Sequence, residues 1–255
     1  MTTTGKRESG AGILSICATP IGNLGDITLR VAETLAHADL VLAEDTRVTR
    51  KLLNHLDVHP RVERCDENTI RQRTPHIIEA LGQGSRIAYV SDAGTPGIAD
   101  PGMHLVAAAR EAGCRVEVLP GASAVLTALV ASGFMASAFY FGGFLPRKKA
   151  QIVATLTPLA ALDAALVFFE SPHRTVLSLA VIAEIFGERE VVLARELTKL
   201  HEEVLRAPAP LLAAQIAQRE QAGRPLKGEI VLVIAPLPPS ATQRVHQDKY
   251  APLQA

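Results

Sequence analysis

The sequence lacks an excess of charge of either sign. Its 255 residues include 26 Lys and Arg and 26 Asp and Glu, so the formal net charge is +0. A broad positive field of the kind that free nucleic-acid binders use is therefore not expected. Any contact with a nucleic acid must come from a local patch of basic residues.

Cysteine and long apolar runs are also scarce. The three cysteines, Cys17, Cys65 and Cys114, lie far apart with no CxxC motif and no adjacent histidine. This spacing favours neither a zinc site nor a disulfide framework, and we expect Cys17 and Cys114 to be small core or near-core residues. The segment 1–12 lacks the apolar core of a signal peptide, and no run approaches transmembrane length. We therefore expect a cytoplasmic protein that binds no metal and no membrane.

The common glycine-rich nucleotide loops are missing as well. The first loop, residues 19–26, contains only Gly22 and Gly25, which does not match GxGxxG, and no Gly-Lys-Ser/Thr sequence occurs. Dinucleotide and nucleoside-triphosphate binding are correspondingly disfavoured.

Short apolar runs alternate with helical patterns, and this predicts an α/β fold with a largely parallel sheet in the first half. The expected strands there are 13–18, 39–43, 62–65, 86–90 and 115–118. The expected helices are 28–36, 46–56, 69–81, 101–112 and 122–131.

The pattern changes after Ser132-Gly133, and we place a domain boundary near residues 132–138. The expected strands beyond it are 139–144, 164–169, 190–194, 203–206 and 229–234, with helices at 147–156, 172–186 and 209–222. The segment 200–207 follows its preceding strand too closely for a helical crossover, so a mixed sheet with an antiparallel element is predicted. The two α/β domains are then 13–132 and 138–236, and the polar or Pro-rich ends 1–12 and 237–255 are expected to be disordered.

The loop 92–102 is the most informative single segment. It follows the strand 86–90, contains three glycines and two prolines, and runs into a helical pattern. Ligands of open α/β sheets bind at the carboxyl ends of the strands, and Gly and Pro allow a rigid loop that a ligand can approach closely. A tight turn between a strand and a helix is the alternative for this loop and for the similar loop 119–124.

Charged groups follow other strand ends. Glu44-Asp45-Thr46-Arg47 precedes a helix that continues with Arg50 and Lys51, and Glu170-Ser171-Pro172-His173-Arg174 is its counterpart in the second half. A helix N-cap at Asp45 and a solvated basic helix face are the alternatives. The cluster Arg147-Lys148-Lys149 at a helix start opposes the helix dipole, which favours a phosphate partner.

Six ordered motifs between residues 13 and 235 resemble the rRNA-methylating branch of the tetrapyrrole methylase-like superfamily. They are Thr19-Pro20-Ile21-Gly22-Asn23-Leu24-Gly25-Asp26, Glu44-Asp45-Thr46-Arg47, Ser91-Asp92-Ala93-Gly94-Thr95-Pro96-Gly97, Pro120-Gly121-Ala122-Ser123-Ala124, Phe169-Glu170-Ser171-Pro172-His173-Arg174 and Arg195-Glu196-Leu197-Thr198-Lys199. The resemblance implies two α/β domains that hold S-adenosylmethionine in the cleft between them, usually as a homodimer. It also implies 2′-O-methylation of a cytidine in the decoding region of 16S rRNA in the small ribosomal subunit.

The resemblance further implies a set of cofactor contacts. They are Pro20, Ile21, Gly22, Gly94, Thr95, Ile98, Ala122 and Ser123, with Phe169, Leu197 and Glu229 from the second half. Relatives that methylate tetrapyrroles tend to carry Gly-Asp-Pro where this chain has Gly94-Thr95-Pro96, and this difference favours the rRNA branch.

Methyl transfer to a ribose needs in-line geometry and no metal, but a 2′-hydroxyl is a poor nucleophile that calls for a base or a stabilising charge. The candidate catalytic residues are Asp45, Glu44, Glu170 and Lys199, with Arg195 as an electrostatic partner. The alternative is that these carboxylates only pair with arginine. The residues expected to hold RNA phosphates are Arg47, Arg50, Lys51, Arg147, Lys148, Arg174 and Arg195. A tetrapyrrole methyltransferase and a non-catalytic RNA-binding assembly protein remain as alternative functions.

Overall fold

The computed structural model describes residues 12–98, 100 and 102–238. Contacts divide the chain into two units, residues 1–124 and 125–255, and each is described by itself. The predicted boundary at 132–138 lies after helix α5 (Ala124–Ser132), whereas the contacts divide the chain at the start of this helix. Most of both predicted disordered ends, residues 1–11 and 239–255, lies outside the described residues.

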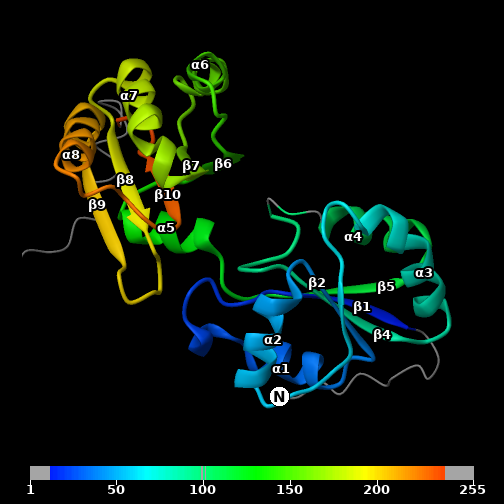
Figure 1. Cartoon of the computed structure of the whole chain (residues 1–255). Coiled ribbons are helices and arrows are strands. Elements are labelled where there is room, and N and C mark those ends of the chain that lie inside the picture. Colours follow the sequence, from blue (N-terminus) through cyan, green and yellow to red (C-terminus); the bar gives the residue numbers. More distant parts are fainter. Residues whose placement is uncertain (1–11, 99, 101, 239–255) are drawn as a thin grey trace, which may run out of the picture. The chain divides into compact units, whose positions relative to one another are not determined.

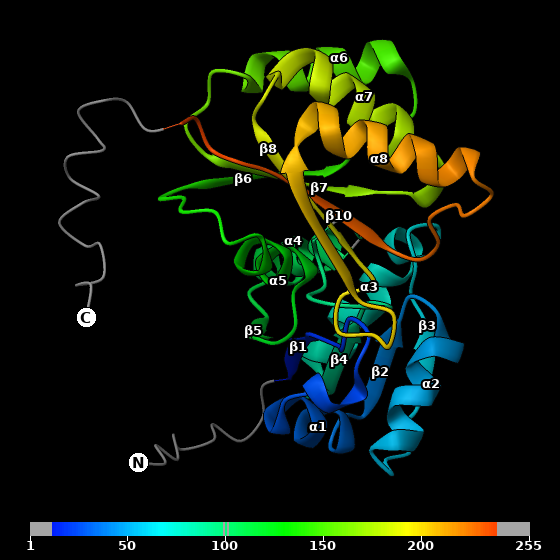
Figure 2. The same cartoon turned by 90° about the vertical axis from the view of Figure 1, so that its left-hand side faces the viewer.

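The first unit, blue to green in Figure 1, contains a five-stranded sheet in the order β3-β2-β4-β1-β5, and Figure 2 labels all of its strands. All four strand pairs are parallel, as the alternating pattern predicts. The strands are β1 (Ile13–Cys17), β2 (Leu40–Ala43), β3 (Val62–Arg64), β4 (Arg86–Val90) and β5 (Arg115–Leu119). The helices between them are η1 (Leu24–Asp26), α1 (Leu29–Ala36), α2 (Thr46–His55), α3 (Ile70–Gly82) and α4 (Gly102–Glu111).

The helices of the first unit cover both faces of its sheet. Leu35 of α1 and Leu52 of α2 belong to one buried cluster with Val90 of β4. Leu81 of α3 and Leu105 of α4 belong to another cluster on the opposite face. Strands that are buried on both faces read as continuous apolar runs, and β4 has this character. Cys17 and Cys65 are buried and Cys114 is half-buried beside the core.

The second unit contains a mixed five-stranded sheet in the order β6-β7-β10-β8-β9 (Figure 1). Its strands are β6 (Phe139–Phe144), β7 (Ala165–Glu170), β8 (Glu190–Arg195), β9 (Glu203–Pro208) and β10 (Ile230–Ile234). The helices after α5 are α6 (Lys149–Leu156), η2 (Thr157–Leu159), η3 (Pro172–Arg174), α7 (Thr175–Phe186) and α8 (Ala209–Gln221). Strands β8 and β9 pair antiparallel, so the antiparallel element predicted from the short connection is confirmed.

Helices α6, α7 and α8 lie together on one side of this sheet (Figure 2). Ile152, Leu179 and Leu212, one from each helix, are fully buried with Phe168 of β7. The neighbouring strand β6 has Gly142 opposite the ring of Phe168, where a Cβ would lie 2.7 Å from its Cδ1. Close packing of a strand on a ring thus fixes the identity of this glycine.

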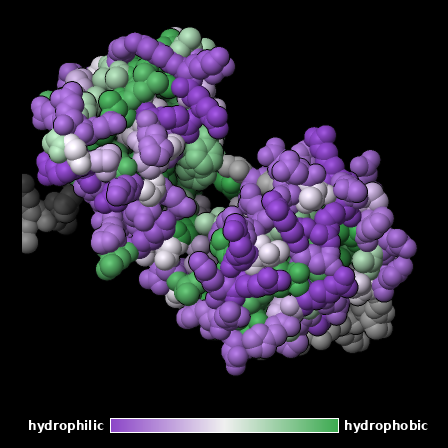
Figure 3. All heavy atoms as spheres, in the orientation of Figure 1, coloured by the Kyte–Doolittle hydropathy of each residue, from purple (hydrophilic) through white to green (hydrophobic). Residues whose placement is uncertain are grey.

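The surface of each unit is mixed in character. On the face drawn in Figure 3, hydrophilic residues dominate and hydrophobic ones form separate patches. Among the described residues, no helix combines the length and the apolar composition that a membrane span requires.

Candidate functional site

The loops of the first unit gather at one edge of its sheet, where the parallel strands β1, β2, β4 and β5 end. We call this the first edge. Helix α1, which follows β1, and helix α4, which follows the neighbouring strand β4, lie on opposite faces of the sheet. The chain after β1 and the chain after β4 therefore lead to helices on opposite faces, and such a point is where open α/β sheets bind ligands.

The loop after β1 and the loop after β4 are joined by a bridge of two backbone hydrogen bonds. The N–H of Thr19 donates to the carbonyl of Gly94 at 2.9 Å, and the N–H of Gly94 donates to the carbonyl of Thr19 at 3.0 Å. The hydroxyl of Thr19 also donates to the carbonyl of Ser91 at 3.2 Å. Gly94 has φ +78°, a conformation that costs an L residue strain. The turn geometry of this loop therefore depends on glycine.

The loop after β5 joins the same group. The hydroxyl of Thr95 donates to the carbonyl of Ala122 at 3.3 Å, and a Cβ on Gly94 would lie 3.8 Å from that carbonyl oxygen. A Cβ on Gly121 would lie 2.7 Å from the Cβ of Ala18. We call residues 18–22, 91–97 and 120–123 the three-loop cluster. It contains all the cofactor contacts expected in the first unit except Ile98, which follows it directly in the chain and is exposed.

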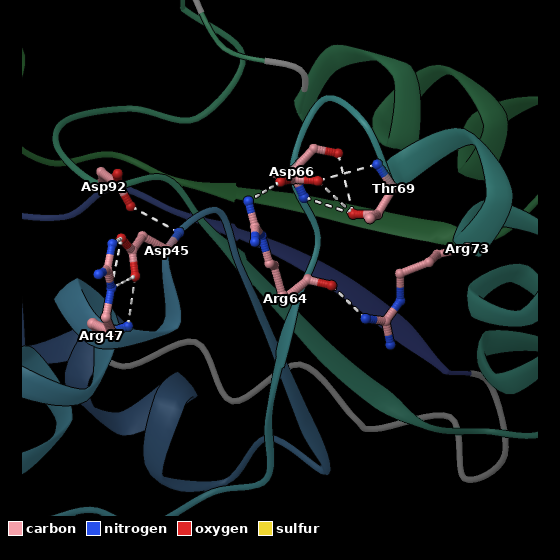
Figure 4. Close-up of polar contacts among 7 residues, drawn as sticks. All are labelled: Asp45, Arg47, Arg64, Asp66, Thr69, Arg73 and Asp92. Atoms are coloured by element: carbon pink, nitrogen blue, oxygen red, sulfur yellow. Dashed lines mark hydrogen bonds and ion pairs between the residues drawn. The ribbon is translucent and has the colours of Figure 1, made fainter.

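The carboxylate of Asp45 caps helix α2 at the first edge (Figure 4). It accepts the N–H of Arg47 at 2.8 Å and lies 2.6 Å from the Arg47 guanidinium, while the N–H of Asp45 donates to Asp92 at 2.9 Å. These contacts with Arg47 hold the pKa of Asp45 well below its usual range. A carboxyl that is so acidic is a weak base at neutral pH. The interpretation of Asp45 as a helix N-cap is confirmed.

Glu44 is half-buried beside Asp45, and its pKa shifts in the opposite direction. Burial raises the pKa of Glu44, and repulsion from Asp92 and Asp100 adds to the rise. A raised pKa moves a carboxylate toward the range in which general bases work. Between the two candidate carboxylates of the first edge, Glu44 is therefore better suited to accept a proton.

Figure 4 also shows an arginine and aspartate pair near the start of α3. Asp66 lies 2.5 Å from the guanidinium of Arg64 and accepts the hydroxyl of Thr69 at 2.7 Å. These contacts hold the chain between β3 and α3. The role that they indicate is structural.

In the second unit, the remaining motifs meet at one edge of the sheet. Strands β6, β7 and β8 end there and β10 begins there, because β10 pairs antiparallel with both β7 and β8. We call this the second edge. Phe169 packs its ring 5.0 Å from that of Phe141, and Leu197 is buried. The three cofactor contacts expected in this half, Phe169, Leu197 and Glu229, thus share one edge.

Glu170 lies at the end of β7 and is held on every side. Its side chain is 0% exposed, it accepts the N–H of Ser171 at 2.6 Å and the hydroxyl of Ser178, and it lies 3.1 Å from the guanidinium of Arg174. This arrangement is the alternative in which the carboxylate only pairs with arginine. It leaves no exposed oxygen for a substrate proton, so the geometry favours a structural role.

The turn after β8 has an unusual backbone. Glu196 and Thr198 have φ +52° and +66°, which is rare for residues other than glycine. The Glu196 carboxylate accepts Lys199 Nζ at 2.8 Å and the N–H of Glu229 at 2.9 Å, and Lys199 also lies 3.0 Å from the Glu229 carboxylate. Strained turns of this kind occur at functional sites.

Lys199 is thereby fixed as a cation at the second edge. Its partial burial disfavours the charged form, but its hydrogen bonds to Glu196 and Glu229 outweigh this effect and raise its pKa. The ammonium group stays protonated at neutral pH, so it can stabilise negative charge but cannot act as a base. The sequence contained Glu196 within a motif, but gave no signal that it holds Lys199.

The basic residues expected to bind RNA fall into two groups. Three are engaged: Arg47 with Asp45, Arg174 with Glu170, and Arg195 with Glu203. The other four side chains, Arg50, Lys51, Arg147 and Lys148, are exposed and have no ion-pair or hydrogen-bond partner within the described part of the chain. Glu203 also binds Arg219 at 2.9 Å. No group of three or more His, Cys, Asp or Glu residues suited to a metal ion occurs among the described residues.

Comparison with known proteins decides the family. Residues 14–213 match the family described as Tetrapyrrole (Corrin/Porphyrin) Methylases. A protein of Vibrio cholerae serotype O1 named "Ribosomal RNA small subunit methyltransferase I" is 45% identical over 227 residues, which are 89% of this chain and 78% of that protein. The chain belongs to this methyltransferase family. It is an enzyme, and S-adenosylmethionine is its methyl donor.

One further sequence relative and one solved structure agree with the family match. The protein of the same name from Thermotoga maritima is 43% identical over 224 residues, 88% of this chain and 98% of that protein. The crystal structure of uroporphyrin-III-C-methyltransferase from Thermus thermophilus has a TM-score of 0.60 at 21% identity, covering 88% of this chain and 94% of that one. The solved structure supports the methyltransferase fold, and the two sequence relatives align over 88–89% of this chain.

Proposed function

We propose that this methyltransferase methylates the 2′-oxygen of a cytidine ribose in the decoding region of 16S rRNA, with the small ribosomal subunit as its substrate. The observation that carries the proposal is the match of 43–45% identity to relatives named as small-subunit rRNA methyltransferases, over 88–89% of this chain. Such a substrate would place the enzyme in the cytoplasm. A tetrapyrrole substrate, the alternative, is disfavoured by Thr95 and by the unpaired basic residues.

The three-loop cluster is proposed to hold the cofactor in the first unit. Its Gly94 has φ +78°, and a Cβ there would fill the space between the loop after β4 and the carbonyl of Ala122. Backbone groups and small side chains suit the close approach of a flat ligand. When bound, S-adenosylmethionine supplies an electrophilic methyl group, so the protein must chiefly orient the reactants.

Glu44 is proposed as the group that accepts the proton of the 2′-hydroxyl. It is half-buried, its pKa is raised, and no ion pair to a basic residue neutralises it in the described part of the chain. Asp45 is too acidic for this role and Glu170 is enclosed by its own partners. Lys199, which carries a permanent charge, is proposed to stabilise negative charge near the second edge.

The homodimer implied by the family resemblance is a separate proposal. It is supported by exposed apolar side chains at the start of the second unit, where Val130 is 80% and Met135 is 81% exposed. Contact with a second copy of the chain would remove these side chains from water. A single mass near 27.2 kDa in light scattering at micromolar concentration would refute the dimer.

The substrate is tested by incorporation of labelled methyl groups. The purified protein should methylate small subunits from cells that lack the enzyme, and mass spectrometry of nuclease digests should find the label on a cytidine ribose. Methylation of a porphyrinoid with none on the subunits would overturn the rRNA assignment.

The cofactor site is tested by titration calorimetry with S-adenosylmethionine. Ala122→Trp should abolish binding, because the indole would fill the three-loop cluster. Ala112→Trp is the matched control, since Ala112 is exposed and lies between α4 and the amino end of β5. Equal affinity of both variants and wild type would remove the cluster from the cofactor site.

A further inference from the structure

The basic residues of the second unit differ in whether a partner neutralises them. Seven are engaged by carboxylates or by backbone carbonyls: Lys149, Arg174, Arg189, Arg195, Lys199, Arg206 and Arg219. The four with no such partner within residues 125–238 are Arg147, Lys148, Arg224 and Lys227, and all four are exposed. Among residues 125–238, free positive charge is therefore confined to two short segments.

Arg224 and Lys227 lie in the loop that leads from α8 to β10, and the backbone of this loop is held firmly. Arg219 Nε donates to the carbonyl of Arg224 at 3.2 Å, and Arg195 Nη1 donates to the carbonyl of Lys227 at 3.2 Å. Leu226, between them, is buried in the core. The loop thus presents two charged side chains from a fixed backbone.

These contacts place the loop at the second edge. Arg195 ends β8 and pairs in register with Glu203, the first residue of β9, and Glu203 also binds Arg219. The segment that carries Arg147 and Lys148 follows β6 at the other side of the same sheet. Arg195, which holds the Lys227 carbonyl, ends β8, and from β6 to β8 there are three strand spacings, about 14 Å at roughly 4.8 Å each.

The charged groups between the two segments are engaged with one another. Arg174 faces Glu170, and Lys199 faces both Glu196 and Glu229. Exposed cations that no carboxylate neutralises are suited to binding phosphates, and two such groups on strand ends about 14 Å apart suit an extended polyanion. At the opposite end of these strands, by contrast, the guanidinium of Arg206 is paired with Glu190.

We propose that Arg224 and Lys227 bind phosphates of the rRNA, so that the RNA runs along the second edge from the loop after β6 to the loop before β10. This rests on the proposed rRNA substrate and extends it to two residues outside the six motifs. The enzyme would hold the RNA backbone at two places along the second edge, which orients the RNA without reading its sequence.

The test is the salt dependence of binding to unmethylated small ribosomal subunits. Arg224→Ala with Lys227→Ala should lower the slope of log K against log salt concentration by about 1.4, the value for two phosphate contacts to a single strand. The KM for subunits should rise several-fold, while kcat at saturation and the affinity for S-adenosylmethionine stay unchanged. Arg110→Ala with Arg115→Ala is the control, because it removes two exposed arginines of the first unit that have no partner in the described residues.

The outcomes separate the two proposals. A lower slope for the Arg224 and Lys227 variant, with the control slope unchanged, supports the inference. If both double variants lower the slope equally, or if neither does while wild type still methylates subunits, the inference is overturned and the proposed function stands. If wild type neither binds nor methylates the subunits, both fail.

Discussion

Gly228→Ala is the substitution for which the structure gives the sharpest expectation. Gly228 has φ +88°, and a Cβ there would lie 2.6 Å from Cγ of Glu196 and closer still to its carboxylate. The Glu196 side chain would have to leave its position, where it binds Lys199 and the N–H of Glu229. The substitution therefore strains the backbone at residue 228 and also breaks the hydrogen bonds of the Glu196 carboxylate.

Gly223→Ala is the matched control in the same loop. Gly223 has φ +71° but no neighbouring atom within 4 Å of an added Cβ, so only backbone strain of about 1 kcal/mol is expected. Gly228→Ala adds the loss of two hydrogen bonds at about 0.5–1.5 kcal/mol each, discounted because Lys199 is partly exposed to solvent. The expected total is about 2–3 kcal/mol.

Thermal unfolding measures the difference. At about 2–4 °C per kcal/mol for a chain of this size, Gly228→Ala should unfold several degrees below Gly223→Ala. The methylation rate should also fall more in Gly228→Ala, since Lys199 loses its support. Equal unfolding temperatures for the two variants would show that Glu196 does not hold the loop as described.

Three other substitutions test single residues. The pKa of Glu44 is raised in the folded protein, so ionisation of this carboxyl opposes folding. Glu44→Gln should therefore raise Tm at pH 8. The gain in Tm should vanish below about pH 4, near the carboxyl pKa of the unfolded chain, because the carboxyl is then protonated in both states. A gain that is constant with pH would contradict the raised pKa. Glu170→Gln should destabilise the protein by about 1–3 kcal/mol in urea because the charge facing Arg174 is lost, whereas a stable but inactive variant would argue for direct catalysis. Thr95→Val removes a hydroxyl that joins two loops and should weaken S-adenosylmethionine binding about 3–10-fold in calorimetry, and unchanged affinity would separate that contact from the cofactor.

The strands and helices followed from the sequence because their apolar patterns are local. The alternation in the first half predicted a parallel sheet, and the short link between β8 and β9 predicted their antiparallel pairing. The order of the strands did not follow, since it depends on contacts between distant segments. The bridge from Thr19 to Gly94 joins residues 75 positions apart and has no local signature.

The sequence also does not reveal which charged side chains pair with one another. Arg174 and Arg147 look alike in the sequence, yet Arg174 is paired with a buried carboxylate and Arg147 is free in the described part of the chain. Arg224 and Lys227 lie outside every recognised motif, so only the contacts that hold their backbone reveal where they lie. The role of Glu196 depends on a positive φ that sequence alone does not specify.

The bridge between Thr19 and Gly94 has a consequence for how this protein can be changed. The loops after β1 and β4 are hydrogen-bonded to each other, and the loop after β4 is hydrogen-bonded to the loop after β5. We therefore expect an insertion in one of these loops to displace the other two. Engineering that transfers a new binding specificity to this protein should therefore exchange all three loops together. A chimaera that receives only one of them keeps its fold but loses the alignment of backbone groups that the other two provide.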